Sequence, residues 1–256
     1  MRDFTLKIYE KLLTGIINVG YNVTTFEKYL SVNNLGDKII ILRHDIDKNP
    51  ENALKIAKLE YKLMIRASYY FRIAKESYNE SIIVKIAKMG HEIGYHYEDL
   101  SLAKGNFELA IEIFEKNLRK FRQFYPVKTI CMHGSPFSRW DNRLIWQKYN
   151  YRNFNIIGEP YFDIDFNKVL YLTETGRKWN GKEVSVRDKV NSKFNYNFKS
   201  TFDIIKALNN NKLPDKLMIN VHPQRWNDNL ALWIKELVWQ NTKNIGKQIL
   251  VKLTQI

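Results

Sequence analysis

The chain is short of cysteine and of long apolar runs. Cys131 is the only cysteine among 256 residues, so no internal disulfide can form, and a reducing compartment is favoured. No run of 18 apolar residues occurs, which predicts that no segment spans a membrane. Residues 1–10 lack an apolar signal-peptide core, so we expect a cytoplasmic protein.

Glycine and proline are also few, at eleven and six residues, and they leave no long flexible linker. No repeat at a fixed period and no low-complexity segment is present. The 45% of hydrophobic residues excludes a disordered chain. We therefore expect one folded domain over residues 1–256, in which residues 1–36 form a helical extension packed on the remainder.

Acidic residues are outnumbered, because 27 Asp and Glu oppose 41 Lys and Arg and give a net charge of +14. Such an excess raises the possibility of nucleic acid, acidic polysaccharide or anionic lipid as a partner. However, the basic residues are spread along the chain without a block of five or six, and no nucleic-acid-binding motif is found. A solvated basic surface is the favoured interpretation, and we expect no nucleic-acid partner.

Strand-like and helix-like segments alternate along most of the chain. The expected strands are 39–43, 66–72, 92–97, 127–133, 169–173 and 216–222, and the expected helices are 4–14, 51–63, 77–89, 105–124, 201–209 and 229–241. This alternation predicts parallel βα units. The number of units favours a barrel closed by helix 229–241, although spacing alone does not distinguish a barrel from an open sheet.

Two aspartates close the first expected strand. The apolar run Ile39–Leu42 is typical of a buried strand, and it leads into Arg43, His44, Asp45 and Asp47. Such carboxylates can cap the following helix and pair with surface cations. They can equally bind a metal or transfer protons, since active sites lie at the carboxyl ends of parallel strands. The strand alone does not decide between these interpretations.

Other strands end in polar residues too. His96 and Glu98 end the third strand, His133 ends the fourth and His222 ends the last. In a parallel barrel these ends converge on one face, so four of the five histidines, His44 included, are expected there. Imidazole and carboxylate together are the ligands of zinc and related divalent ions. This convergence favours metal binding or proton transfer, and not helix capping, as the role of Asp45 and Asp47.

An ordered set of motifs resembles the NodB-homology polysaccharide deacetylases, carbohydrate esterase family 4. The set comprises Asp45-Ile-Asp47, Gly90-His-Glu-Ile-Gly-Tyr-His96, His133-Gly-Ser-Pro136 and Ile219-Asn-Val-His222, within residues 39–226. The stretches 44–47, 131–136 and 221–226 resemble most a sub-branch of deacetylases from O-antigen (lipopolysaccharide) biosynthesis loci. The resemblance implies a distorted (β/α)7-type barrel.

The family's activity implies hydrolysis of an N-acetyl group on a sugar, assisted by a divalent metal. By residue-by-residue match, Asp45 is the general base, Asp47 and His96 are metal ligands, and His222 is the general acid. Zn²⁺ is the expected ion, with Co²⁺, Ni²⁺, Mn²⁺ and Fe²⁺ as alternatives. The expected substrate is an N-acetylated sugar, linked to a nucleotide or a lipid, in surface polysaccharide synthesis.

Two positions depart from the family pattern. Leu100 stands where the family has a second metal-binding histidine, and His133 stands where it usually has an arginine. Either His133 or Glu98 can supply the missing ligand, and we favour His133. The competing hypotheses are a sugar-binding protein that has lost its metal and activity, and a hydrolase of another non-peptide C–N bond.

Further residues are expected to contact the substrate. They are Arg43, Tyr97, Glu98, Ser135, Arg177, Trp179, Arg225 and Trp226. Aromatic rings can stack on a pyranose, although such rings at strand–helix junctions are equally often packing residues. Arginines can bind a phosphate or an acidic sugar. Arg43 or Arg139 is also expected to keep Asp45 ionised.

Overall fold

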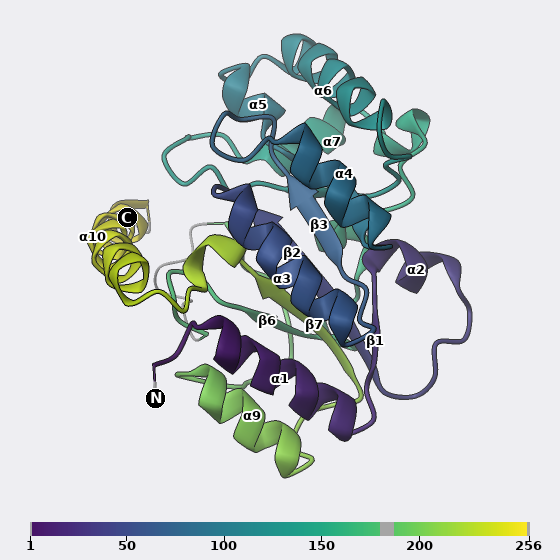
Figure 1. Cartoon of the computed structure of the whole chain (residues 1–256). Coiled ribbons are helices and arrows are strands. Elements are labelled where there is room, and N and C mark those ends of the chain that lie inside the picture. The colour runs from purple at the N-terminus through teal and green to yellow at the C-terminus, as the bar shows by residue number, and fades with distance from the viewer. Residues whose placement is uncertain (1, 180–186, 255–256) are drawn as a thin grey trace.

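The computed structural model describes residues 2–179 and 187–254, with side chains through residue 246 in the last helix (Figure 1). The strands are β1 (Asn22–Thr24), β2 (Ile39–Ile46), β3 (Ser68–Phe71), β4 (Glu92–Tyr97), β5 (Ile130–Met132), β6 (Leu170–Thr173) and β7 (Lys216–Val221). The helices are α1 (Leu6–Asn18), α2 (Phe26–Ser31), α3 (Pro50–Lys62), α4 (Glu80–Lys88), α5 (Asp99–Leu102), α6 (Phe107–Arg122), α7 (Ile145–Lys148), α8 (Pro160–Asp163), α9 (Thr201–Asn209) and α10 (Leu230–Thr254).

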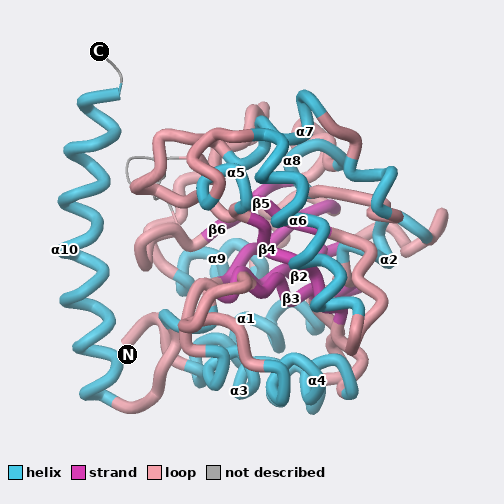
Figure 2. Tube along the Cα trace, turned by 90° about the horizontal axis from the view of Figure 1, so that it is seen from above, coloured by secondary structure: helices cyan, strands magenta, loops and turns pink. Residues whose placement is uncertain are grey.

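The strands form one parallel sheet in the order β5-β4-β3-β2-β7-β6, with β1 paired to the first half of β2. The sheet curls into a half barrel, and helices α1, α3, α4, α6 and α9 lie around it (Figures 1 and 2). The predicted distorted (β/α) barrel is therefore confirmed. None of the described helices is both long and apolar enough to cross a membrane.

Two of the predicted elements differ from the structure in ways that matter for the site. Strand β2 continues to Ile46, so Asp45 lies within the strand and not after it. Helix α10 is longer than the predicted 229–241 and stands beside the half barrel without closing it (Figure 2). Its buried face is polar, as Asn244 shows by donating to the carbonyl of Gly176, and such a face does not pack on an apolar sheet.

Side chains alternate between the two faces of β2, and this alternation separates two polar groups. Asp45 faces the interior of the half barrel, whereas His44 faces the helices. His44 Nε2 lies 2.7 Å from Glu60 of α3, and Tyr69 also donates to Glu60 at 2.6 Å. The expectation that His44 joins the strand-end histidines is therefore wrong. His44 directly precedes Asp45 in the strand, so its side chain points to the opposite face of the sheet.

Gly94 in β4 has no side chain, and this leaves room for a large neighbouring side chain. A Cβ at this position would lie 2.2 Å from the ring of Tyr70 and 3.1 Å from the carbonyl of Thr129. The Tyr70 hydroxyl lies 2.9 Å from Thr129 Oγ1, which fixes the ring inside the sheet. Two residues further along the same face, His96 stands above this packed layer.

After β4 the chain turns directly into α5, and this turn determines where the side chain of Leu100 lies. Leu100 is fully buried in the apolar core, so position 100 does not reach the interior of the barrel. The preceding Asp99 is also fully buried, and its Oδ1 accepts hydrogen bonds from Tyr95 at 2.6 Å and Asn117 at 3.0 Å. Burial raises the pKa of Asp99 to about 7 despite these bonds.

Replacing Asp99 by Asn is expected to stabilise the protein above pH 7. The pKa of Asp99 rises from 3.8 in its ordinary state to about 7 in the folded protein, so the folded state keeps a proton that the unfolded chain has released. Stability therefore falls as pH rises between these values. Asparagine does not titrate, so the variant avoids this loss in the free energy of unfolding, which is on the order of 1 kcal/mol or more. Urea unfolding at pH 5 and pH 8 measures the difference.

The exposed Asp37 provides the matched control, since Asp37→Asn should leave the change in stability between pH 5 and pH 8 as it is in the wild type. An Asp99→Asn variant that loses as much stability as the wild type over this range would contradict the assignment.

Candidate metal centre

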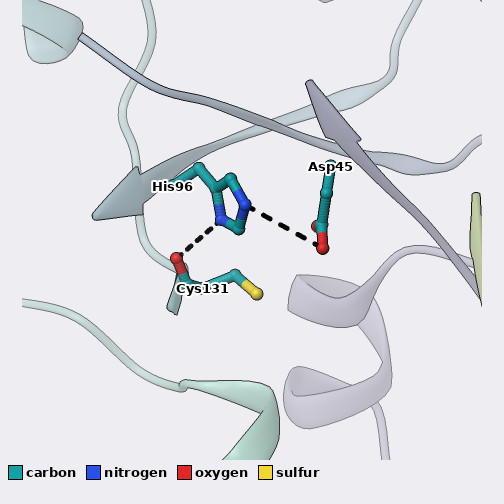
Figure 3. Close-up of side chains that lie close together, drawn as sticks. All are labelled: Asp45, His96 and Cys131. Carbon is teal, nitrogen blue, oxygen red and sulfur yellow. Dashed lines mark hydrogen bonds and ion pairs between the residues drawn. The ribbon is translucent and has the colours of Figure 1, made fainter. Parts of the chain in front are cut away.

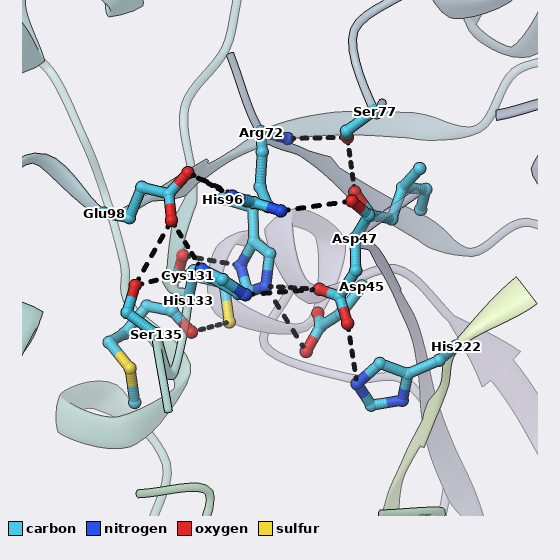
Figure 4. A network of polar contacts seen from close by, with 12 residues as sticks. Asp45, Asp47, Arg72, Ser77, His96, Glu98, Cys131, His133, Ser135 and His222 are labelled. Carbon is cyan, nitrogen blue, oxygen red and sulfur yellow. Dashed lines mark hydrogen bonds and ion pairs between the residues drawn. The ribbon is translucent and has the colours of Figure 1, made fainter. Parts of the chain in front are cut away.

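The carboxyl ends of β2, β4, β5 and β7 surround a cavity of about 450 Å³. Asp45 and Asp47 reach it from β2 and the loop after it, and His96 reaches it from β4 (Figure 4). His133 and His222 follow directly after β5 and β7. The structure thus brings together the five residues to which the sequence assigned the chemistry.

Asp47 lies at the centre of the group. Its Oδ1 is 3.7 Å from Nε2 of His96 and 3.7 Å from Nε2 of His133. The ligand atoms of the three residues lie within 4.8 Å of one another. Oδ1 of Asp47 is buried, and no described group donates a hydrogen bond to it. A cation bound to this oxygen would offset its desolvation.

Both imidazoles are held so that Nε2 turns to Asp47. Nδ1 of His96 lies 2.9 Å from the carbonyl oxygen of Cys131, and Nδ1 of His133 lies 2.7 Å from Oε2 of Glu98. A partner on one ring nitrogen fixes the orientation of the ring and leaves the other nitrogen for a metal.

Glu98 is committed to this supporting role. Besides His133, it accepts two hydrogen bonds from Arg72, from Nε at 2.9 Å and from Nη2 at 2.6 Å. Burial alone would raise the pKa of Glu98, but His133 and then Arg72 lower it to about 2. Between the two alternatives for the third ligand, the geometry thus favours His133. Nothing in the sequence indicated that Arg72 belongs to the site, except its position at the end of a predicted strand.

The donor set fits a divalent metal. Two imidazole nitrogens and one carboxylate oxygen are the ligands of many zinc and non-haem iron sites. Bonds of about 2.1 Å to each donor require the donors to lie roughly 3.0–3.5 Å apart. The two separations of 3.7 Å from Asp47, with all three donors within 4.8 Å of one another, leave the side chains close enough to converge on an ion.

Asp45 stands next to this set and is held by an arginine. Its Oδ2 accepts hydrogen bonds from Arg43 at 3.0 Å and from Asn220 at 2.9 Å. Burial would raise the pKa of Asp45, yet Arg43, followed by His96 and His222, holds it below its ordinary value. Asp45 is therefore a carboxylate at neutral pH. Arg139 instead lies over the ring of Trp140, so Arg43 is the arginine that keeps Asp45 ionised.

His222 completes the group from the opposite side. Its Nε2 lies 4.0 Å from Oδ2 of Asp47, and its Nδ1 lies 3.6 Å from Oε1 of Glu174. Glu174 is fully buried, accepts the backbone N–H of His222 at 2.6 Å and pairs with Arg225 at 2.6 Å. Glu174 was not expected from the sequence, although it directly follows a strand, as the other site residues do.

The residues predicted to bind substrate fall into two groups. Glu98, Ser135 and Arg225 line the cavity, although the guanidinium of Arg225 is engaged by Glu174. Five others do not line it and are buried elsewhere, namely Arg43, Tyr97, Arg177, Trp179 and Trp226.

Packing and charge pairing explain these five positions, which corrects the expectation of sugar contacts. Tyr97 and Trp226 are fully buried among aromatic rings, and the indole of Trp179 donates to Thr201 at 2.9 Å. The guanidinium of Arg177 lies 4.6 Å from the ring of Trp233, and Arg43 binds Asp45.

No protein-family model and no curated protein matches this chain. Among solved structures, a CE4 family pseudoenzyme from Bacillus anthracis is similar, with 14% sequence identity and a TM-score of 0.46 over 83% of this chain and 62% of that one. A mutant of that protein, described as having restored enzymatic activity, gives the same identity and TM-score over 64% of its length. This chain thus spans less than two thirds of those it matches, and at this identity the likeness is one of fold alone.

Proposed function

We propose that this protein is a metal-dependent hydrolase that removes the N-acetyl group from a sugar. The observation that carries the proposal is the convergence of Asp47, His96 and His133, with Asp45 and His222 on either side. The motif resemblance supplies the reaction class, and the geometry supplies a base, an acid and a metal-binding donor set in one cavity.

The proposed ligands are Asp47, His96 and His133. Zn²⁺ suits this set best, and Co²⁺, Ni²⁺, Mn²⁺ and Fe²⁺ are further candidates. When bound, such an ion polarises the acetyl carbonyl and makes a water molecule more acidic. Burial lowers the pKa of His133 more than Glu98 and Asp47 raise it, so the ring is neutral and available as a ligand at neutral pH.

Asp45 is proposed as the general base. It is ionised, and both of its hydrogen bonds are to Oδ2, so the lone pairs of Oδ1 are not engaged by any described group and can take a proton. His222 is proposed as the general acid, which gives its Nε2 proton to the leaving amine. Glu174 next to Nδ1 holds the ring in position. General acid–base catalysis of this kind contributes about 10²–10⁴-fold in rate.

The loop after His133 offers a surface for the sugar. Phe137 lines the cavity and is 76% exposed, so its ring is available to stack on a pyranose. Arg187 fixes this loop by donating to the carbonyl oxygens of Gly134, Ser135 and Ser138. An exposed aromatic ring on a well-held loop beside a polar site is typical of sugar binding.

The cavity rim also carries Lys48 and, from α10, Lys243. Lys48 is paired with Glu236 at 2.8 Å, so Lys243 is the cation that supports an anionic carrier, such as the phosphate of a nucleotide- or lipid-linked sugar. We propose that such a sugar is deacetylated in the cytoplasm during synthesis of a surface polysaccharide, within a single domain comprising the whole chain. The single buried cysteine is compatible with that compartment.

Replacing Asp45 by Asn is expected to lower kcat by about 10²–10⁴-fold, because the amide cannot accept the proton from water. Acetate release from UDP-N-acetylglucosamine and from chitotriose, with Zn²⁺ supplied, measures the change. The exposed Asp165→Asn is the matched control and should keep full activity. An Asp45→Asn protein that binds metal and retains near-normal activity would show that Asp45 is not the base.

Replacing Glu98 by Gln is expected to weaken Zn²⁺ affinity about 10–100-fold, because His133 loses the partner that orients it. Isothermal titration with Zn²⁺ measures the affinity. Glu76 is the matched control, since it also contacts Arg72, at 3.3 Å, but does not contact His133. If His133→Ala binds Zn²⁺ normally while Glu98→Gln does not bind it, Glu98 is the ligand and the assignment is wrong.

Replacing Phe137 by Ala is expected to raise KM about 3- to 10-fold with little change in kcat, because the ring binds substrate without taking part in the reaction. Steady-state kinetics on the same two substrates separate the two constants. Phe162, which is 49% exposed and does not line the cavity, is the control position. An unchanged KM in Phe137→Ala would remove this residue from the sugar site.

A further inference from the structure

A second group of metal-binding side chains lies deeper in the half barrel. It consists of Asp45, His96 and Cys131, whose ligand atoms lie within 4.8 Å of one another (Figure 3). His96 and Cys131 are direct partners in the pairing of β4 with β5, so their side chains project side by side. All three residues are buried.

Two of these donors have weak or no protein partners. Oδ1 of Asp45 is buried and accepts no hydrogen bond from any described group, whereas Oδ2 accepts both of those that Asp45 receives. The thiol of Cys131 has only a long contact, 3.8 Å, to the carbonyl of Met132. Asp45 therefore has one oxygen without a protein partner, and Cys131 has a loosely held thiol, in the group that His96 completes.

We propose that Asp45, His96 and Cys131 form an inner metal position that selects thiophilic cations such as Cd²⁺ and Hg²⁺. Sulfur, nitrogen and oxygen donors together suit soft and borderline ions, whereas hard ions gain little from a thiol. On binding, the Cys131 thiol releases its proton to solvent and coordinates as a thiolate.

The inner position and the position at Asp47 exclude one another. Nε2 of His96 lies 3.7 Å from Oδ1 of Asp47 and 4.0 Å from Oδ2 of Asp45, so it belongs to both donor sets. Because one ring nitrogen binds one ion, an ion at the inner position takes His96 from the outer set and occupies Asp45. The inner site therefore acts as an inhibitory site.

Arg43 makes this site selective. Its guanidinium is 3.0 Å from Asp45 and opposes a second positive charge there. The negative charge of a thiolate offsets that opposition, so an ion that binds sulfur strongly enough to displace the thiol proton gains the most from this position. The softness of the metal thus decides which of the two positions is occupied.

Titration of the full-length protein with Cd²⁺, followed by ultraviolet absorption, tests the proposal. Because Cys131 is the only cysteine, a thiolate-to-cadmium charge-transfer band can come from this residue alone. The wild type should show a band that saturates at one equivalent. Cys131→Ser should show none, and His133→Ala should keep it, since His133 belongs only to the outer set.

His96→Ala and Asp45→Asn separate a built site from binding by the thiol alone. Each should shift the midpoint of the band to at least 10-fold higher Cd²⁺ concentration, with circular dichroism confirming that the variants are folded. A wild type that binds Cd²⁺ without the band, or a midpoint unchanged in both variants, overturns the proposal. The test needs no turnover, so its outcome is independent of the hydrolase activity.

Discussion

Arg43 and Asp45 lie on the same face of β2 and form an ion pair in which both side chains are almost wholly buried. Removing one member of such a pair leaves an uncompensated charge inside the protein, which is strongly destabilising. The pair is repeated around the cavity, since Arg72 binds Glu98 and Arg225 binds Glu174. Arg43 lies within β2, whereas Arg72 and Arg225 come after β3 and β7.

Each of the three pairs serves a different functional side chain. Arg43 acts directly on Asp45, Glu98 orients His133, and Glu174 contacts the backbone and ring of His222. The interior of the half barrel is therefore a set of charge pairs, each of which contacts one group of the site. This arrangement keeps the ionised carboxylates in place before any substrate or metal arrives, which is a form of electrostatic preorganisation.

The sequence predicted the residues that lie at strand ends, because the ends of parallel strands meet wherever the strands themselves are recognised. It placed β4 and α9 with their correct bounds, and the alternation rule would have separated His44 from Asp45. It could not identify Arg72 or Glu174, since each is defined by a partner that is distant in sequence. The aromatic residues predicted to bind sugar were buried, because large rings fill a core as readily as they bind a ligand.

The location of Leu100 is a second feature that the sequence pattern does not predict. A histidine there would need the strand to continue past Glu98, but the chain turns into α5 and carries position 100 into the apolar core. The ligand that a motif would place on β4 is instead available from β5, at His133. The sequence motifs alone do not show that His133 lies beside Asp47 and His96, because it comes from a different strand of the sheet.

Strand β2 carries polar partners on both of its faces, and this has a consequence for how its register is specified. The residues Ile39–Leu42 are apolar without alternation, so they would be buried equally well after a shift of one position. Only Arg43, His44 and Asp45 tell the two faces apart, through partners on opposite sides of the sheet. The strand is therefore aligned by its charges, and insertions or deletions within it should be far less tolerated during evolution than exchanges among its aliphatic residues.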